Sequence, residues 1–263
     1  MSELNRNRAV IHYEAWGQDE NPEGAWVTLV NGHTRPLNDF RMMGKHLVGL
    51  GYRVLALDNR GAGQTTYSGS FSLKDMADDV AALWDELKIE ETAVLGISMG
   101  GFIAQTLTQL HPDRMTKLIL ISTAPGQQHL DKHEVPWTAD VHAVQKKLNA
   151  YFTPSFAQRN ATLVASMAKQ IAKGVVAGTF KEGAAAQRQA IGKFDNDQLD
   201  AIEVPTLVIH GSEDAIIKVA AAEELAGGIP NAEKVLLPSA GHLLLAEKPR
   251  ELYDLVGKFL ARN

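Results

Sequence analysis

Short aliphatic runs alternate with amphipathic helical patterns along most of this chain, and this alternation constrains the fold more than any other feature. The runs are almost continuously apolar, which is typical of strands that helices cover on both faces. The segments between them repeat apolar residues at helical spacing, as in Leu73, Met76 and Val80. The pattern predicts an α/β fold, in which a mostly parallel central sheet is flanked by helices. The predicted strands are residues 26–30, 53–57, 92–95, 117–121, 206–209 and 234–237, with residues 10–16 as an antiparallel edge strand.

The alternation stops between residues 123 and 203, where no strand is predicted. Two sets of apolar residues in this segment recur at steps of three and four, and each set marks one face of a helix. We therefore expect a helical lid over the carboxyl edge of the sheet, where open α/β sheets bind ligands. The predicted division is a core of residues 1–122 and 204–263 with a lid of residues 123–203. The two sets are Trp137, Val141, Val144, Leu148 and Tyr151, and Leu163, Met167, Ile171 and Val175.

Composition excludes several classes of function. The net charge is −5 and no long basic run occurs, so nothing favours a nucleic acid or a membrane surface as partner. The chain has no cysteine, which excludes disulfides, thiolate catalysis and cysteine-based metal sites. The first eight residues lack the apolar core of a signal peptide, and no apolar run reaches the ~18 residues of a membrane span. We expect a cytoplasmic protein that needs no metal and no cofactor, while its oligomeric state is left open.

The pentapeptide of residues 96–100 has the pattern G-x-S-x-G and lies between a predicted strand and a predicted helix. A serine at such a junction sits on a tight, strained turn that exposes its hydroxyl at the carboxyl end of the strand. The helix that follows directs its N-terminus at the same point, which favours a developing negative charge. The pattern predicts that Ser98 is a nucleophile.

A serine nucleophile needs a base to activate it and an acid to orient that base. His242 lies in a small-residue loop after the last predicted strand, so it should reach the same edge of the sheet as Ser98. Asp214 follows the strand that ends at Ile209, with Glu213 as its only close rival. We interpret His210, at the end of that strand, as structural. The predicted order is therefore serine, aspartate, histidine.

A tetrahedral intermediate also needs two donors for its oxyanion. The backbone N–H of Met99, directly after the nucleophile, is one candidate. The second should come from the loop of residues 31–34, where Gly32 allows close approach of the backbone and His33 would supply the N–H.

Together these motifs resemble the α/β-hydrolase superfamily over nearly the whole chain. Residues 58–65 resemble the D-x-R-G-x-G-x-S segment of that family, which serves as a loop scaffold. The sequence departs from the family at Asn31, where many members carry histidine. The resemblance implies an α/β-hydrolase fold with a helical lid insertion after the sixth strand, and the aspartate nucleophile of related dehalogenases is replaced by Ser98.

The expected function is a serine hydrolase that cleaves a small carboxylic ester or lactone. The resemblance leaves open an enol-lactonase, a carbon–carbon bond hydrolase or a cofactor-free perhydrolase on the same residues, and also a non-catalytic ligand-binding protein. Aromatic and methionine side chains of the lid either wall an apolar substrate pocket or form the lid's own core. The pocket candidates are Trp137, Tyr151, Phe152 and Met167.

Overall fold

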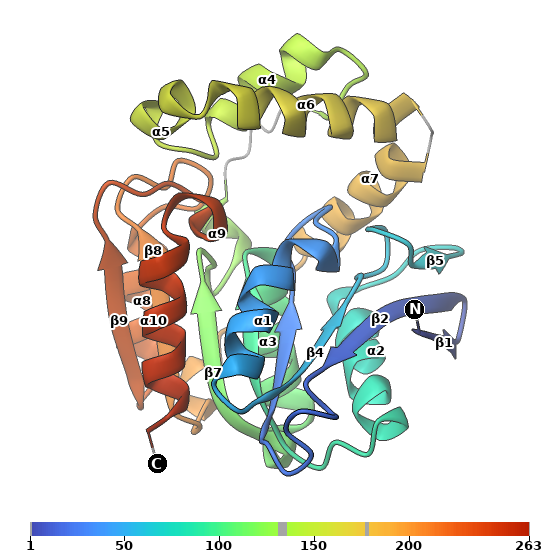
Figure 1. The fold of residues 1–263 in the computed structure, drawn as a ribbon, viewed down its shortest axis with the longest axis vertical. Helices are drawn as coiled ribbons and strands as arrows, with labels where there is room; N and C mark the ends of the chain where they lie inside the picture. The colour runs from blue at the N-terminus through green and yellow to red at the C-terminus, as the bar shows by residue number, and fades with distance from the viewer. Residues whose placement is uncertain (1, 131–135, 177–178, 263) are drawn as a thin grey trace.

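The structure, a computed structural model, describes residues 2–130, 136–176 and 179–262. These residues form a nine-stranded sheet with helices on both faces and a helical layer beyond one edge (Figure 1). The strands are β1 (Ser2–Arg6), β2 (Ala9–Trp16), β3 (Trp26–Val30), β4 (Arg53–Leu57), β5 (Thr66–Tyr67), β6 (Thr92–Ile97), β7 (Met115–Ile121), β8 (Thr206–Gly211) and β9 (Ala232–Leu237). Short 3₁₀ helices lie at Leu37–Phe40, Pro112–Arg114, Gln127–His129 and Leu199–Ala201.

The sheet has the order β1-β2-β4-β3-β6-β7-β8-β9, with β5 paired to β2. Strands β3, β4 and β6 to β9 are mutually parallel, which confirms the predicted mostly parallel sheet. Strand β2 pairs antiparallel with β4, as predicted, but it is not the edge, because β1 pairs along its other side. The lid follows β7, the seventh strand in chain order, so its expected place after the sixth strand is wrong. The residue pattern predicted five strands before the lid, and β1 and β5 are the two that it missed.

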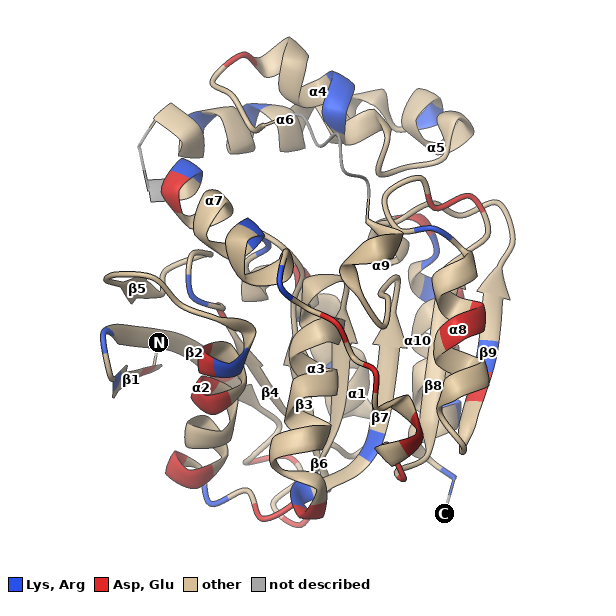
Figure 2. Ribbon diagram, turned by 180° about the vertical axis from the view of Figure 1, so that it is seen from behind, with Lys and Arg blue, Asp and Glu red and all other residues tan. Residues whose placement is uncertain are grey.

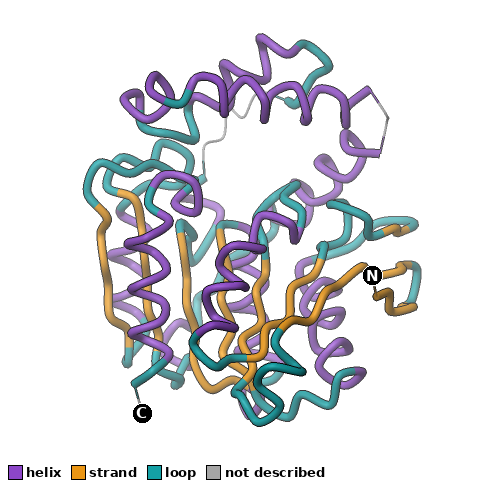
Figure 3. Tube along the Cα trace, viewed as in Figure 1, coloured by secondary structure: helices purple, strands orange, loops and turns teal. Residues whose placement is uncertain are grey.

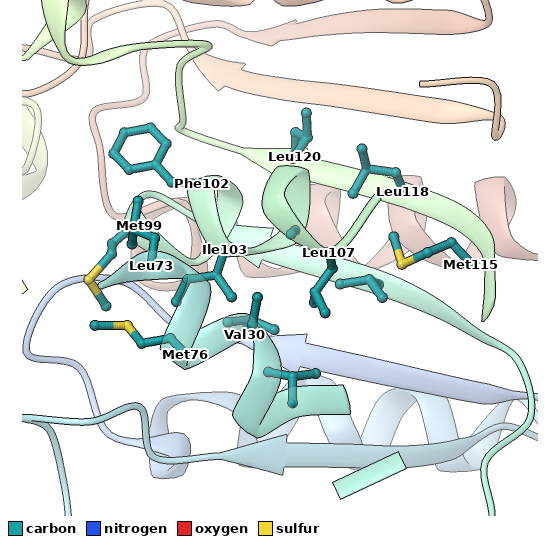
Figure 4. Close-up of a cluster of buried hydrophobic side chains, with 14 of the residues drawn as sticks. Val30, Leu73, Met76, Met99, Phe102, Ile103, Leu107, Met115, Leu118 and Leu120 are labelled. Atoms are coloured by element: carbon teal, nitrogen blue, oxygen red, sulfur yellow. The ribbon is translucent and has the colours of Figure 1, made fainter. Parts of the chain in front are cut away.

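Helices cover the two faces of the sheet. Helices α1 (Arg41–Gly49) and α10 (Pro249–Leu260) pack on one face, and α2 (Leu73–Glu86), α3 (Met99–Leu110) and α8 (Ala220–Gly228) pack on the other (Figure 1). Successive strand residues enter opposite clusters: Val94 contacts the α2 and α3 side, and Leu95 contacts the α1 and α10 side. Figure 4 shows part of the first cluster, in which Ile103 and Leu107 of α3 lie among side chains of the strands and of α2. The aliphatic runs are therefore strands buried on both faces.

The segment predicted as a lid contains α4 (Val141–Asn149), α5 (Pro154–Arg159), α6 (Ala161–Val176) and α7 (Thr179–Ile191). Figure 3 shows α4, α5 and α6 beyond the strand ends, whereas α7 descends to the core. Helix α4 is shorter than the apolar spacing indicates, because the Asp140 side chain accepts from the backbone N–H groups of His142 and Ala143 and caps the helix. Trp137 and Tyr151 therefore flank the helix, although Trp137 still belongs to the buried cluster of the lid.

Charge is unevenly distributed between lid and core. The sequences of α4, α5 and α6 contain Lys and Arg but no Asp or Glu, and Figure 2 shows these basic residues along the lid. Most of them are exposed, as solvated helix faces usually are.

Among the described residues, no helix combines the length and the apolar character needed to cross a membrane.

Candidate active site

Ser98 occupies a strained turn between β6 and α3. Its φ of 54° and ψ of −119° lie outside the regions that residues with a side chain usually adopt. The surrounding structure holds this conformation: the Ser98 N–H donates to Ile121 O at 2.9 Å, and Thr123 Oγ1 donates to Ser98 O at 2.8 Å. A Cβ at position 100 would lie 2.0 Å from Val30 O, so Gly100 allows α3 to begin directly against β3.

His242 and Asp214 follow the two strands at the far side of the sheet and converge on Ser98. His242 Nε2 lies 3.1 Å from Ser98 Oγ, and His242 Nδ1 lies 2.8 Å from Asp214 Oδ2. Both residues are buried, with 3% and 8% of their surface exposed. Because a carboxylate can only accept, Nδ1 carries the proton of the imidazole and Nε2 offers its lone pair to the serine hydroxyl.

The carboxylate of Asp214 is held by four donors. Its Oδ1 accepts from the backbone N–H groups of Ile216 at 2.8 Å and Ile217 at 3.0 Å. Burial favours the neutral acid, but the charge of His242 and the hydrogen bonds from His210 and His242 outweigh it and hold the pKa of Asp214 well below its usual value. Asp214 is therefore ionised throughout the neutral and mildly acidic range.

His210 is a partner of Asp214 that sequence reasoning missed. Its side chain is fully buried, and Nε2 lies 3.2 Å from Asp214 Oδ2 and 3.1 Å from Ile217 O. The interpretation of His210 as structural omits this contact with the acid. No sequence signal identifies it, because the contact depends on how the turn after β8 folds back.

The loop between β3 and the 3₁₀ helix at Leu37–Phe40 lies against Ser98. A Cβ at Gly32 would be 3.3 Å from Ser98 Cβ, and His33 lines the same cavity as Ser98 and Met99. Met99 is the first residue of α3, where N–H groups have no partner within the helix. Asn31 braces the loop: its side chain accepts from Gly32 N–H and donates to Pro36 O, both at 2.8 Å.

A cavity of about 670 Å³ opens onto Ser98 and His242 between the core and the lid. Of the four pocket candidates, Trp137, Tyr151 and Met167 line it, and the missed residues Leu163 and Ile171 extend the apolar wall along α6. Phe152 is absent from the described lining; it is 3% exposed and its ring stacks on Phe156 with centroids 5.1 Å apart. Lid aromatics thus lie both along the cavity and within the lid's own buried cluster.

The turn between α4 and α5 is bonded to the loop that carries His242. Tyr151 O accepts from the N–H groups of His242 at 2.9 Å and Leu243 at 3.2 Å. Glu247 of α9 (Leu244–Glu247) accepts from Gly241 N–H and Thr153 N–H, each at 3.1 Å. The histidine loop is therefore fixed from the lid as well as from the sheet.

Comparison with known proteins agrees with this fold. The family model described as serine aminopeptidase, S33, matches residues 21–249. The 3-oxoadipate enol-lactonase 2 of Acinetobacter baylyi is 28% identical over 80% of this chain and 79% of its own, and a candidate non-heme bromoperoxidase of Mycobacterium tuberculosis is 28% identical over 80% and 84%. The crystal structure of the enol-lactonase from Burkholderia xenovorans aligns with a TM-score of 0.86 at 26% identity, covering 99% of this chain and 100% of that one. Because the family model spans most of the chain, this protein belongs to the serine aminopeptidase S33 family of α/β hydrolases and is a hydrolase.

Proposed function

We propose that this hydrolase cleaves a small carboxylic ester or lactone through an acyl-enzyme on Ser98. The observation that carries the proposal is the continuous chain of hydrogen bonds from Ser98 Oγ through His242 to Asp214, at 3.1 Å and 2.8 Å. A base within hydrogen-bond distance of the nucleophile, itself oriented by an ionised acid, is the arrangement that activates a serine hydroxyl.

In the first half of the reaction, Ser98 Oγ bonds to the acyl carbon while His242 Nε2 takes the serine proton. The carbonyl oxygen becomes an oxyanion, which the amides of Met99 and His33 stabilise. His242 then gives its proton to the leaving alcohol as the carbon–oxygen bond breaks. Asp214 stabilises the transient imidazolium and keeps the ring in place.

In the second half, His242 takes a proton from water, and the resulting hydroxide bonds to the acyl carbon. Collapse of this intermediate releases the carboxylic acid and returns the proton to Ser98 Oγ. With a lactone, the alcohol of the first half stays attached to the acyl group, so the product is a single hydroxy acid. The apolar wall of Trp137, Leu163 and Ile171 favours substrates with an apolar portion.

The comparisons favour two alternatives on the same residues. Similarity to enol-lactonases favours an enol-lactone substrate, and similarity to the candidate bromoperoxidase favours a perhydrolase, in which hydrogen peroxide replaces water in the second half. The similarities named above do not favour a carbon–carbon bond hydrolase, and a non-catalytic role does not suit a chain similar to these enzymes. Rates with a phenyl ester, with an aromatic lactone such as dihydrocoumarin, and with acetate plus peroxide separate the three reactions.

Replacing Ser98 by alanine tests the proposal. Hydrolysis of p-nitrophenyl acetate should fall by about 10⁴-fold or more in kcat, because only the oxyanion site and substrate binding are left. Ser166→Ala is the matched control, since Ser166 is exposed on α6 and outside the cavity lining, and it should keep the wild-type rate. A folded Ser98→Ala enzyme with the rate of the control would overturn the proposed nucleophile.

A further inference from the structure

One contact between helix α7 and the core is made by a buried polar side chain, Gln187. Gln187 is fully buried; its Oε1 accepts from the Thr34 N–H at 2.7 Å, and its Nε2 donates to Arg60 O at 2.8 Å. One turn earlier on the same helix, Ala184 O accepts from His33 Nε2 at 2.8 Å. Helix α7 is thus bonded to the loop that carries His33, more than 150 residues away in sequence.

The second hydrogen-bond partner of Gln187, Arg60 O, belongs to a firmly held segment. Arg60 is 6% exposed, and its guanidinium donates to both carboxylate oxygens of Asp79, at 2.6 Å and 2.8 Å. The residue after Arg60 is Gly61, and its backbone touches that of α7, because a Cβ on Gly183 would lie 2.2 Å from Gly61 O. Gln187 therefore links the His33 loop to a segment that a buried ion pair and a close backbone contact hold in place.

The His33 peptide is constrained on each side. Before it, Gly32 N–H donates to the side chain of Asn31. After it, Thr34 has a φ of 63°, a left-handed conformation that costs energy in a residue with a side chain. The bond from Thr34 N–H to Gln187 stabilises this conformation, since a buried N–H without a partner is costly.

We infer that Gln187 is a positioning residue, which holds the His33 amide in the direction that an oxyanion donor requires. The inference rests on the proposed function. Donors aimed in advance at the developing charge lower the barrier because they need no reorganisation during the reaction. Through Gln187, the lid therefore sets the geometry of the oxyanion site, although the Gln187 side chain does not line the cavity.

Gln187→Leu removes both hydrogen bonds at similar side-chain volume. We expect kcat for p-nitrophenyl acetate to fall by roughly 10- to 100-fold, less than the loss of an oxyanion donor itself, with KM nearly unchanged. Gln189→Leu is the matched control, because Gln189 lies on the same helix but is exposed and outside the cavity lining. The control should keep the wild-type kcat.

A pair of inhibitors separates positioning from a merely structural role. Ser98 Oγ adds to the carbonyl carbon of a trifluoromethyl ketone, the proton passes to His242, and the oxygen occupies the oxyanion site as an anion. The matching methyl ketone binds without this step. In Gln187→Leu the affinity for the trifluoromethyl ketone should fall in proportion to kcat, while the affinity for the methyl ketone is unchanged.

Gln187→Glu keeps an oxygen for the Thr34 N–H and covers the case in which the leucine variant does not fold. Its kcat and its affinity for the trifluoromethyl ketone should lie between those of Gln187→Leu and the Gln189→Leu control. If kcat and the affinity for the trifluoromethyl ketone equal those of the control in each folded Gln187 variant, the inference is overturned. The proposed function then still stands, provided that Ser98→Ala is inactive. Full activity of Ser98→Ala would instead overturn the proposed function.

Discussion

At the scale of single residues, the proposed mechanism depends on which nitrogen of His242 carries its proton. In Asp214→Asn the side-chain oxygen should keep its bonds to the N–H groups of Ile216 and Ile217, so the new NH₂ group faces His242 Nδ1. The imidazole proton then moves to Nε2, which can no longer accept from Ser98. We expect kcat to fall by about 10³- to 10⁴-fold. Glu213→Gln, at an exposed neighbour, should leave kcat unchanged, and the reverse ranking in p-nitrophenyl acetate assays would identify Glu213 as the acid.

The same residues predict how activity depends on pH. A protonated His242 cannot accept the serine proton, so kcat/KM should decline at acidic pH. The pKa of Asp214 is lowered by His242 and His210 despite burial, so Asp214 stays ionised as the pH falls through this range. The acidic limb of the pH–rate profile should therefore have the slope of a single protonation. A slope that requires two protons, in an enzyme shown to be folded at each pH, would contradict this assignment.

The sequence predicts the residues whose position follows from the strand pattern alone. Ser98, Asp214 and His242 each follow a parallel strand, and the carboxyl ends of parallel strands meet at one edge of the sheet. His210 and Gln187 could not be predicted in this way. Their contacts depend on the path of a turn and on the docking of a distant helix, which leave no local pattern.

At the scale of elements, the turn from β6 to α3 depends on the absence of a side chain at Gly100. A methyl group there would lie 2.0 Å from Val30 O and 2.8 Å from Asn31 O, so Gly100→Ala must displace either α3 or β3. We expect the free energy of unfolding to fall by about 1–3 kcal/mol and activity to fall with it. Chemical denaturation with circular dichroism measures the change.

Gly227→Ala is the control for this prediction. Gly227 is exposed near the end of α8, and a Cβ there meets no atom within 4 Å. Alanine should be neutral or stabilise by up to about 1 kcal/mol, because it is the better helix former. Equal free energies of unfolding in the two variants would show that the close approach of α3 and β3 does not contribute to stability.

The elements that escaped prediction lack the apolar pattern on which the prediction depends. Strand β1 has mostly exposed side chains, so no alternation of buried and exposed residues marks it, and β5 is only two residues long. Helix α7 has small residues at 183–186 and then the buried polar Gln187, and its large apolar core residue, Ile191, stands at its end, so no regular apolar face marks the helix. The spacing of Trp137 and Tyr151 predicted a longer helix than α4. Both residues pack in the same cluster as α4 without belonging to the helix.

At the scale of the whole molecule, the lid and the core meet at both sides of the proposed reacting centre. Tyr151 bonds to the His242 loop, and α7 bonds to the His33 loop. The cavity between them opens onto Ser98. The lid of residues 123–203, proposed from the sequence as a cover over the sheet, is thus in our account also a support for the two loops that would carry the base and an oxyanion donor.

The central claim is that Ser98 alone among the serines of this chain is activated. Inactivation by an ethyl p-nitrophenyl phosphonate, followed by peptide mass spectrometry, tests it most directly, because phosphonylation needs both the base and the oxyanion site. We expect one adduct per chain, located on Ser98, with activity lost in proportion to labelling. In Asp214→Asn the reagent should cause neither labelling nor inactivation over the same time. Stoichiometric labelling of another residue, or full activity in a protein completely labelled at Ser98, would contradict it.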